Sequence, residues 1–510
     1  MTATTPSTTT PTTTTTTAAP APGAAPDRLA GRTPAPPPPA SDTRGPLARL
    51  RLRTRPARVL ALAVAAVLAV AALFLTTNTA IGHARDGLRV IGHQAGPQVV
   101  TTANLYFALS DMDTQLANIL LNGKSTDLGF GSAQSRSVYD QDRAAADAAA
   151  IQALRLTGSD PAQQATVREL LDGLGQYEKL AAEAMKLDEQ ADHRAGATPE
   201  NVLAVHRDAT DLMRLDLLPK AYNLTLDSGA IVRGTYDSEH GAVLAGRWWV
   251  GLAGLAAVAL LVALQVYLTV RFRRLVNPAL AVATLGCLAF TIAGALLLSA
   301  EAGHLREAKV HGFDSVLALS RARAISNAMN ADESRFLLDP SRAVTYDQVY
   351  LAKAQSILYA PAVDLNGYRG GINARLGPSG MPRTPMEGFL GVEARHITLP
   401  GQRAVVSRTL SGFRQFQRSD AKVRALAAHG DRHGAVAVRL GKAEGASNVD
   451  FALYDLSLGS LIDVHQQTFT EAIADGDAEL GGWNIALPLI GIVVVALIVV
   501  GVRPRVAEYR

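Results

Sequence analysis

Two long apolar runs separated by a short basic loop, within residues 247–300, restrict the fold of this chain more than any other feature. Residues 248–270 and 279–300 contain no charged side chain. As helices, both are long enough to cross the hydrocarbon core of a membrane, which takes about 20 residues. The loop between them, residues 271–278, contains three arginines: Arg271, Arg273 and Arg274. A loop this short makes the two helices antiparallel neighbours, and its arginines indicate that it lies in the cytoplasm.

Two further apolar segments, residues 59–76 and 483–502, complete a set of four predicted spans. Residues 1–58, which precede the first of them, are rich in Thr and Pro and then in Arg, so we expect a disordered tail that becomes basic near the membrane. A cleaved signal peptide is the alternative for residues 59–76. The tail is much longer than the charged region of a signal peptide, and no convincing cleavage site follows, which favours an uncleaved anchor.

The distribution of charge predicts the orientation of the spans. The total charge of +4 conceals net charges of +6 in residues 1–58, +3 in residues 271–274 and +2 in residues 503–510, which leaves −7 for the rest of the chain. Positive charge is retained on the cytoplasmic side of membranes. We therefore expect a multi-pass protein of the cell membrane, with both termini in the cytoplasm and two long segments, 77–247 and 301–482, outside the cell.

Both external segments carry the pattern of packed helices. Apolar residues recur at alternating steps of four and three, as in a coiled coil, along the first helix of segment 77–247: Leu105, Leu109, Met112, Leu116 and Ile119. Asp160 before Pro161 predicts the start of a later helix, with the aspartate as its N-cap. Since the helical pattern runs from each external segment into the next span, we predict two membrane-rooted bundles of four helices.

Short sequence matches favour a tandem duplication of span, bundle and span, with chance similarity as the alternative. The matched pairs occur in the same order in both halves: Gly82-His83 with Gly303-His304, and Ala108-Leu109-Ser110 with Ala318-Leu319-Ser320. Residues 364–401 have no counterpart in the first half. They are rich in Gly and Pro, and loops of this length are often functional.

The predicted fold class is therefore an all-α membrane protein with four transmembrane helices and two external domains that resemble four-helix bundles. In chain order we expect these segments: cytoplasmic tail 1–58, span 59–76, bundle 77–247, span 248–270, basic loop 271–278, span 279–300, bundle 301–482 with loop 364–401, span 483–502 and cytoplasmic tail 503–510.

The sequence contains no motif that indicates an enzyme. Phosphate-binding, dinucleotide-binding, kinase and nucleophile-elbow motifs are missing, so we expect no catalytic site, no cofactor and no metal. His429 and His433 have the spacing of metal ligands on a helix, but Gly430 between them favours a polar loop. The spans contain no Asp, Glu, Lys, Arg or His, which disfavours a transporter, whereas Gly251 and Gly254 suit close helix packing.

A reversal of charge between the two halves predicts where the bundles meet. Aspartates follow Ser110 and arginines follow the matching Ser320: Asp111, Asp113, Arg321 and Arg323. If the bundles associate through their first helices, these aspartates and arginines lie opposite one another. The alternative is that the two helix faces are simply solvated.

Each half resembles the external four-helix sensor module of bacterial chemoreceptors and sensor kinases, on the basis of its architecture and of the helices at 100–121 and 313–338. Over about residues 55–505, the order of spans and bundles around a basic hairpin resembles the actinobacterial GlnX-type membrane proteins. That resemblance implies a relay of amino-acid status from an external binding lipoprotein to a soluble Ser/Thr kinase of the PknG type. It assigns no role to an individual residue.

We therefore expect a sensor or relay without enzymatic activity, and the loop arginines Arg271, Arg273 and Arg274 are its candidate output surface. Candidate partners are an extracellular solute-binding protein, a cytoplasmic Ser/Thr kinase, membrane lipid and a second copy of the chain. The charge pattern does not indicate nucleic acid. A structural scaffold of the cell envelope is the alternative function.

Overall fold

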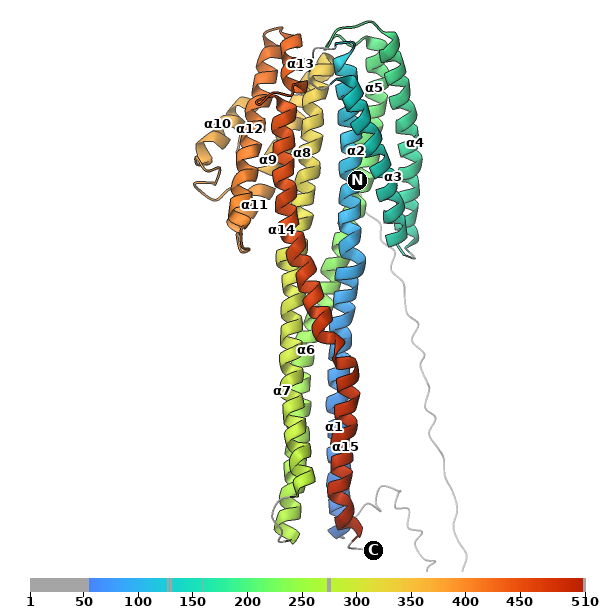
Figure 1. Ribbon diagram of the computed structural model, residues 1–510, viewed down its shortest axis with the longest axis vertical. Coiled ribbons are helices and arrows are strands. Elements are labelled where there is room, and N and C mark those ends of the chain that lie inside the picture. The colour runs from blue at the N-terminus through green and yellow to red at the C-terminus, as the bar shows by residue number, and fades with distance from the viewer. Residues whose placement is uncertain (1–54, 126–127, 129–130, 159, 273–276, 508–510) are drawn as a thin grey trace, which may run out of the picture. The chain divides into compact units, whose positions relative to one another are not determined.

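The computed structural model describes residues 55–507, apart from residues 126–127, 129–130, 159 and 273–276. Within this part of the chain there are helices and one isolated β-bridge, between Leu376 and Pro382 (Figure 1). The predicted all-α membrane fold is confirmed, because four continuous helical stretches are long and apolar enough to cross a membrane: Ala57–Asn122, Glu200–Val270, Pro278–Leu338 and Ser447–Pro504. Most of the predicted N-terminal tail lies outside the described residues.

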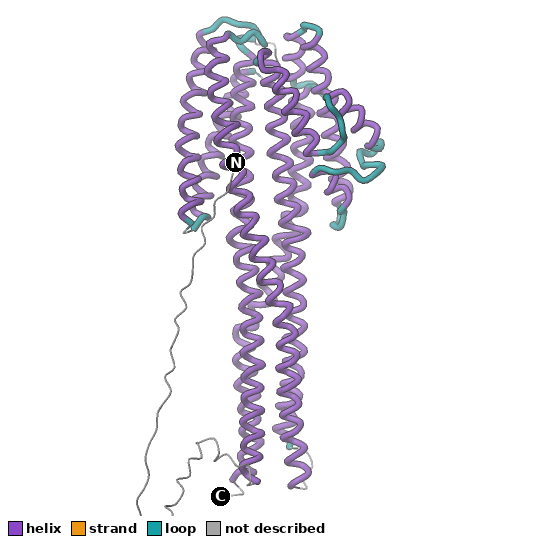
Figure 2. Tube along the Cα trace, turned by 180° about the vertical axis from the view of Figure 1, so that it is seen from behind, coloured by secondary structure: helices purple, strands orange, loops and turns teal. Residues whose placement is uncertain are grey.

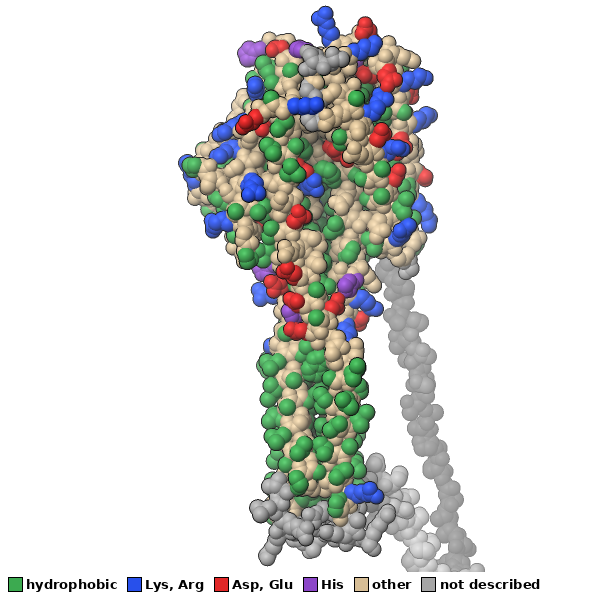
Figure 3. All heavy atoms as spheres, viewed as in Figure 1, with side chains coloured by type: hydrophobic (Ala, Val, Ile, Leu, Met, Phe, Trp, Pro, Cys, Tyr) green, Lys and Arg blue, Asp and Glu red, His purple; other side chains and the backbone are tan. Residues whose placement is uncertain are grey.

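Four apolar helices form the membrane part: α1 (Arg55–Leu88), α6 (Leu218–Phe272), α7 (Pro278–Arg306) and α15 (Trp483–Ala507). Helix α1 packs against the other three, and α7 also packs against α6 and α15. Large apolar side chains such as Leu68 and Leu255 face outward. Apolar side chains cover much of the face of this membrane part that Figure 3 shows. Exposing such an apolar surface to water is energetically unfavourable, whereas the hydrocarbon of a bilayer accommodates it.

Of Gly251 and Gly254, the two glycines that suit close packing of the spans, only Gly254 lies at a contact between two membrane helices. A Cβ atom at Gly254 of α6 would lie 2.2 Å from the side chain of Thr291 on α7, so only glycine allows this approach. A Cβ atom at Gly251 would meet nothing within 4 Å. Gly254 therefore sets the distance between the membrane helices of the two halves.

The first bundle consists of α2, α3, α4 and a last helix made of three consecutive pieces that continues into the membrane. Their bounds are α2 (Gly96–Asn122), α3 (Ser132–Leu156), α4 (Pro161–Gln190), α5 (Glu200–Leu212), η3 (Met213–Leu217) and α6. The predicted N-cap is confirmed, because the Asp160 carboxylate accepts a hydrogen bond from the Ala162 amide at 2.9 Å. The five apolar residues of the predicted pattern on α2 are all buried, and all of them except Ile119 belong to the core of the first bundle.

The second bundle is built on four longer helices, α8 (Asp314–Leu338), α9 (Ala343–Ile357), α12 (Gln402–Ala428) and α14 (Ser447–Gly481). Short helices lie between or beside them: η5 (Pro340–Arg342), α10 (Leu365–Arg375), α11 (Phe389–Arg395) and α13 (Arg432–Leu440). The segment 364–401 thus contains two helices, which are too short to show a clear periodicity. Tyr368 anchors the first of them by donating to the Ala354 and Leu358 carbonyls, both at 2.9 Å.

Two π-helices, η2 (Arg89–Ala95) and η4 (Glu307–Phe313), join the spans to the first helices of the bundles. Helix α1 continues through η2 into α2, and α7 continues through η4 into α8, as the rods in Figure 2 show. Helix α14 lies so close to η4 that a Cβ atom at Gly312 would meet the backbone of Phe469 at 2.8 Å. The chain therefore runs without a loop from the membrane into the helices where the bundles meet.

Candidate functional site

The first helices of the two bundles, α2 and α8, pack side by side and form the main contact between the bundles (Figure 1). Both helices bury polar side chains in this contact. On α8, residues 330–335 (Asn-Ala-Asp-Glu-Ser-Arg) are all buried, although five of the six are polar. Burying charged groups is costly unless they are paired, so their partners define the interface.

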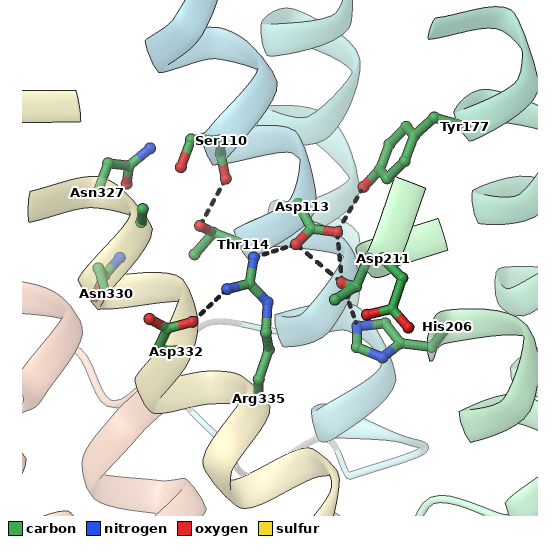
Figure 4. Close-up of polar contacts among 12 residues, drawn as sticks. Ser110, Asp113, Thr114, Tyr177, His206, Asp211, Asn327, Asn330, Asp332 and Arg335 are labelled. Carbon is green, nitrogen blue, oxygen red and sulfur yellow. Dashed lines mark hydrogen bonds and ion pairs between the residues drawn. The ribbon is translucent and has the colours of Figure 1, made fainter. Parts of the chain in front are cut away.

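Asp113 of α2 and Arg335 of α8 form an ion pair across this interface, and both side chains are fully buried (Figure 4). Asp113 also accepts hydrogen bonds from the hydroxyls of Thr210 on α5, at 2.8 Å, and Tyr177 on α4, at 3.2 Å. Burial raises the pKa of Asp113, but the Arg335 charge and the hydrogen bonds outweigh this effect and hold the pKa below its usual range. The ionised carboxylate therefore ties three helices of the first bundle to α8.

Arg335 continues the network into the second bundle. Its Nη1 donates to Asp332, one turn earlier on α8, at 2.6 Å. The other oxygen of Asp332 lies 2.5 Å from the Lys353 ammonium of α9. Burial, aided by the positive charge of Arg335, lowers the pKa of Lys353 to about 8, although Asp332 opposes this shift. Alternating charges thus run from Asp113 through Arg335 and Asp332 to Lys353.

A second polar group crosses the same interface next to Arg335 on α8 and further along α2. The Ser334 hydroxyl donates to Asn118 of α2 at 2.7 Å and accepts from Arg439 Nε of α13 at 2.8 Å. Arg439 is fully buried and lies 3.5 Å from Glu333. Burial raises the pKa of Glu333 to about 7, although the charge of Arg439 acts in the opposite direction. The polar contacts of the interface therefore extend into the interior of the second bundle.

An arginine of α5 adds a bidentate pair beyond the end of α8. Arg207 donates to both oxygens of Asp339, at 2.7 and 2.9 Å. Burial raises the pKa of Asp339, but the hydrogen bonds from Arg207 and Ser341 outweigh it and lower the pKa to about 2. Because a bidentate arginine–carboxylate pair has a strict geometry, this contact restricts the angle between the bundles.

The structure gives other partners to the four residues of the predicted charge reversal. Asp113 pairs with Arg335. Asp111 accepts a hydrogen bond from Gln115 of its own helix at 3.4 Å, and burial raises its pKa. Both arginines contact the first bundle through aromatic rings: Arg321 donates to the Tyr222 hydroxyl at 3.0 Å, and Arg323 lies 4.3 Å from the centroid of Phe107. Arg323 forms its ion pair with Asp455 of α14, at 2.7 Å.

The register of the two helices explains why these aspartates and arginines do not meet. The matching serines are 210 positions apart in the sequence, whereas residues in contact, such as Asn118 with Ser334, are 216 apart. Six residues correspond to about 9 Å along a helix. The predicted interface between the first helices therefore exists, but with different pairs.

The candidate output arginines cannot be placed in the same way. Arg273 and Arg274 lie outside the described residues. Arg271 is the second-last residue of α6, which ends at Phe272, and the structure does not describe its side chain. Among the described residues, no three His, Cys, Asp or Glu side chains are placed to hold a metal ion together.

A pocket of about 380 Å³ lies beside the ion-pair network, between the bundles. We call it the interface pocket, and both bundles line it: Tyr106, Arg214, Leu218, Pro219 and Tyr222 from the first bundle, and Ile325, Ala328, Arg335 and Lys353 from the second. Sequence reasoning missed this site. The sequence signal that could have revealed it is the polar run 330–335. Its charged side chains point to different faces of the helix, so packing this helix in a bundle must bury some of them.

Comparison with known proteins identifies one part of the chain. Residues 87–237 match the family model of the actinobacterial sensor domain. The matched stretch begins at the end of α1, continues through α2 to η3 and ends within α6, and it includes Asp113, Arg214 and Tyr222. No curated protein and no solved structure matches the chain. The match and the four apolar helices together indicate a membrane protein with a sensing or signalling role.

Proposed function

We propose that this protein is a transmembrane sensor that relays an extracellular nutrient signal, such as the supply of an amino acid, to a cytoplasmic partner. The signal reaches the bundles directly or through a solute-binding protein, and the partner is a Ser/Thr kinase or a protein of similar role. In this proposal both bundles lie outside the cell, both chain ends and the 271–278 loop lie inside, and the protein catalyses no reaction of its own.

The observation that carries this proposal is the Asp113–Arg335 pair, because it joins two helices that continue directly into the membrane. Helix α2 is continuous with α1 through η2, and α8 is continuous with α7 through η4. A displacement of α2 against α8 therefore reaches the other side of the membrane without passing through a loop. Shifts of about 1–2 Å between packed helices are a known mode of signalling.

The buried charges make the interface suited to discrete states. Moving Asp113 away from Arg335 without a new partner leaves charges buried and unpaired, which is strongly unfavourable. Intermediate displacements are therefore avoided, and the interface changes between arrangements in which every charge is paired. A signal acts by binding one arrangement more tightly than the other.

Distance measurements between spin labels on α1 and α7 test the relay. The labels are placed at Leu60 and Val282, which face outward near the predicted cytoplasmic side, in a chain with Cys287→Ser and reconstituted in nanodiscs. We expect Asp113→Asn, which weakens the cross-bundle ion pair, to shift the distance between the labels by about 1–2 Å or to add a second population.

The matched control is Glu189→Gln, which removes an exposed ion pair with Arg136 on the outer surface of the first bundle. It should leave the distance distribution unchanged. Circular dichroism establishes that both variants are folded. An unchanged distribution in a folded Asp113→Asn variant contradicts the relay between this interface and the membrane helices.

A further inference from the structure

The interface pocket lies where a ligand would contact both bundles at once. Its lining comes from α2, η3 and α6 of the first bundle and from α8 and α9 of the second. Its volume of about 380 Å³ is within the range of pockets that bind small molecules. A molecule held there would stabilise one relative position of the bundles over another.

The charges around the interface pocket do not balance. Three cations line it: Arg214, Arg335 and Lys353. Two carboxylates, Asp113 and Asp332, form ion pairs with the last two of these cations. This group therefore carries one positive charge in excess.

Arg214 is the one of these three cations that forms no direct ion pair within the described part of the chain, although its charge helps to lower the pKa of Asp332. The contact that the structure describes for its guanidinium is with the Tyr346 ring, at 5.7 Å from the centroid, and no ion pair of Arg214 occurs among the described residues. Arg335 also has an unused donor, because its Nε is buried without a hydrogen-bond partner in the described part of the chain. Two guanidinium groups beside one pocket thus have donors available for an anion.

The remaining lining is apolar or aromatic. Leu218 and Pro219 come from the first bundle, and Ile325 and Ala328 come from the second. The rings of Tyr106 and Tyr222 lie on the first-bundle side, and Tyr222 is held in place by a hydrogen bond from Arg321. A ligand that fits this lining has an uncharged, largely apolar body in addition to its anionic group.

We propose that the interface pocket binds a small organic anion with one carboxylate and an apolar body. The carboxylate accepts hydrogen bonds from Arg214 and Arg335, and the apolar body packs between α6 and α8. This inference rests on the proposed sensor function, because it names the chemistry of the ligand that shifts the bundles. Since both bundles supply contacts, the ligand binds their two arrangements with different affinities, as a sensor requires.

Titration calorimetry on the full chain in nanodiscs tests this assignment. The probe is phenylacetate, which has one carboxylate and an apolar ring; phenylacetamide is its neutral counterpart, and inorganic phosphate represents an anion without an apolar body. We expect saturable binding of phenylacetate, with phenylacetamide and phosphate binding at least about tenfold more weakly, because each lacks one of the two recognised features.

Arg214→Gln should weaken phenylacetate binding by about tenfold or more, since it removes a charge-assisted hydrogen bond. Arg214 has no ion pair among the described residues, so this variant should fold. Arg168→Gln, at an exposed arginine of α4, is the matched control and should bind as the unmodified chain does.

The assignment is overturned if phenylacetate does not bind, if phenylacetamide or phosphate binds equally well, or if Arg214→Gln has no effect. These outcomes leave the relay unaffected, because the spin-label experiment needs no ligand. Conversely, binding that depends on Arg214, combined with unchanged label distances in Asp113→Asn, supports the pocket and contradicts the relay.

Discussion

The first bundle buries mainly apolar side chains, whereas the second also buries a set of arginines and carboxylates. The core of the first bundle is formed by residues such as Leu116, Leu170 and Ala181. In the second bundle, Arg335 and Arg439 are the two largest side chains that are fully buried. Both bundles root their first helix in the membrane through a π-helix, so they share a plan but differ in what stabilises them.

A further buried network in the second bundle makes the contrast clearer. Asp420 on α12 forms ion pairs with Arg424 on the same helix, at 2.9 Å, and with Arg369 on α10. Arg424 in turn pairs with Asp347 on α9. Apolar contacts tolerate small displacements, whereas hydrogen-bonded charge pairs need a specific geometry. Charge pairs of this kind therefore restrict the geometry inside the second bundle, and the first bundle, most of which matches the family model of the actinobacterial sensor domain, packs against it.

The largest expected effect comes from removing the charge that joins the two halves. Arg335→Ala should lower the free energy of unfolding by about 3–5 kcal/mol, because Asp113 and Asp332 are left buried without their main partner. The free energy of unfolding is measured by denaturant titration of the chain in mild detergent, with circular dichroism as the signal. Arg136→Ala, which breaks the exposed pair with Glu189, should cost only about 0–1 kcal/mol. Equal costs for the two variants would remove the distinction between the bundles.

A smaller effect is expected where the halves meet in the membrane. Gly254→Leu should destabilise the chain by about 1–3 kcal/mol, since its side chain would overlap Thr291 and push α6 away from α7. Gly251→Leu is the matched control, because no atom lies within 4 Å of the Cβ position there. The thermal midpoint in nanodiscs distinguishes them. If both variants melt at the same temperature, the two halves do not depend on this contact.

The smallest expected effect is on how stability depends on pH. One buried histidine in each bundle contributes to this dependence, and the two contributions have opposite signs. In the second bundle, burial lowers the pKa of His465, but the Glu393 carboxylate at 2.7 Å and the His311 carbonyl outweigh it and raise the pKa. In the first bundle, burial lowers the pKa of His206 to about 4.

A raised pKa stabilises the folded state below the unfolded value of about 6.5, and this stability is lost as the pH rises through the folded value. His465→Gln should therefore remove a decrease in thermal midpoint above about pH 6.5. A lowered pKa has the reverse effect, so His206→Gln should remove a loss of stability as the pH falls from about 6.5 to about 4. Midpoints of both variants measured against pH test this, and parallel curves for variants and unmodified chain would contradict it.

Local sequence patterns were sufficient for the elements of the fold. The charge-free runs predicted the four apolar helices, and Asp160 before Pro161 predicted the start of α4. The regular spacing along α2 predicted residues that are all buried. These properties depend on neighbours within one or two turns, and such neighbours can be read from the order of residues.

Tertiary structure decided the site. The sequence shows that aspartates on α2 and arginines on α8 exist, but the axial offset between the helices determines that Asp113 meets Arg335 rather than Arg323. The interface pocket depends on the same offset, because it brings Arg214, Arg335 and Lys353 together from helices distant in the chain. The physical reason is that helix periodicity specifies which face of a helix is buried, whereas its position along a neighbouring helix results from all the contacts between them.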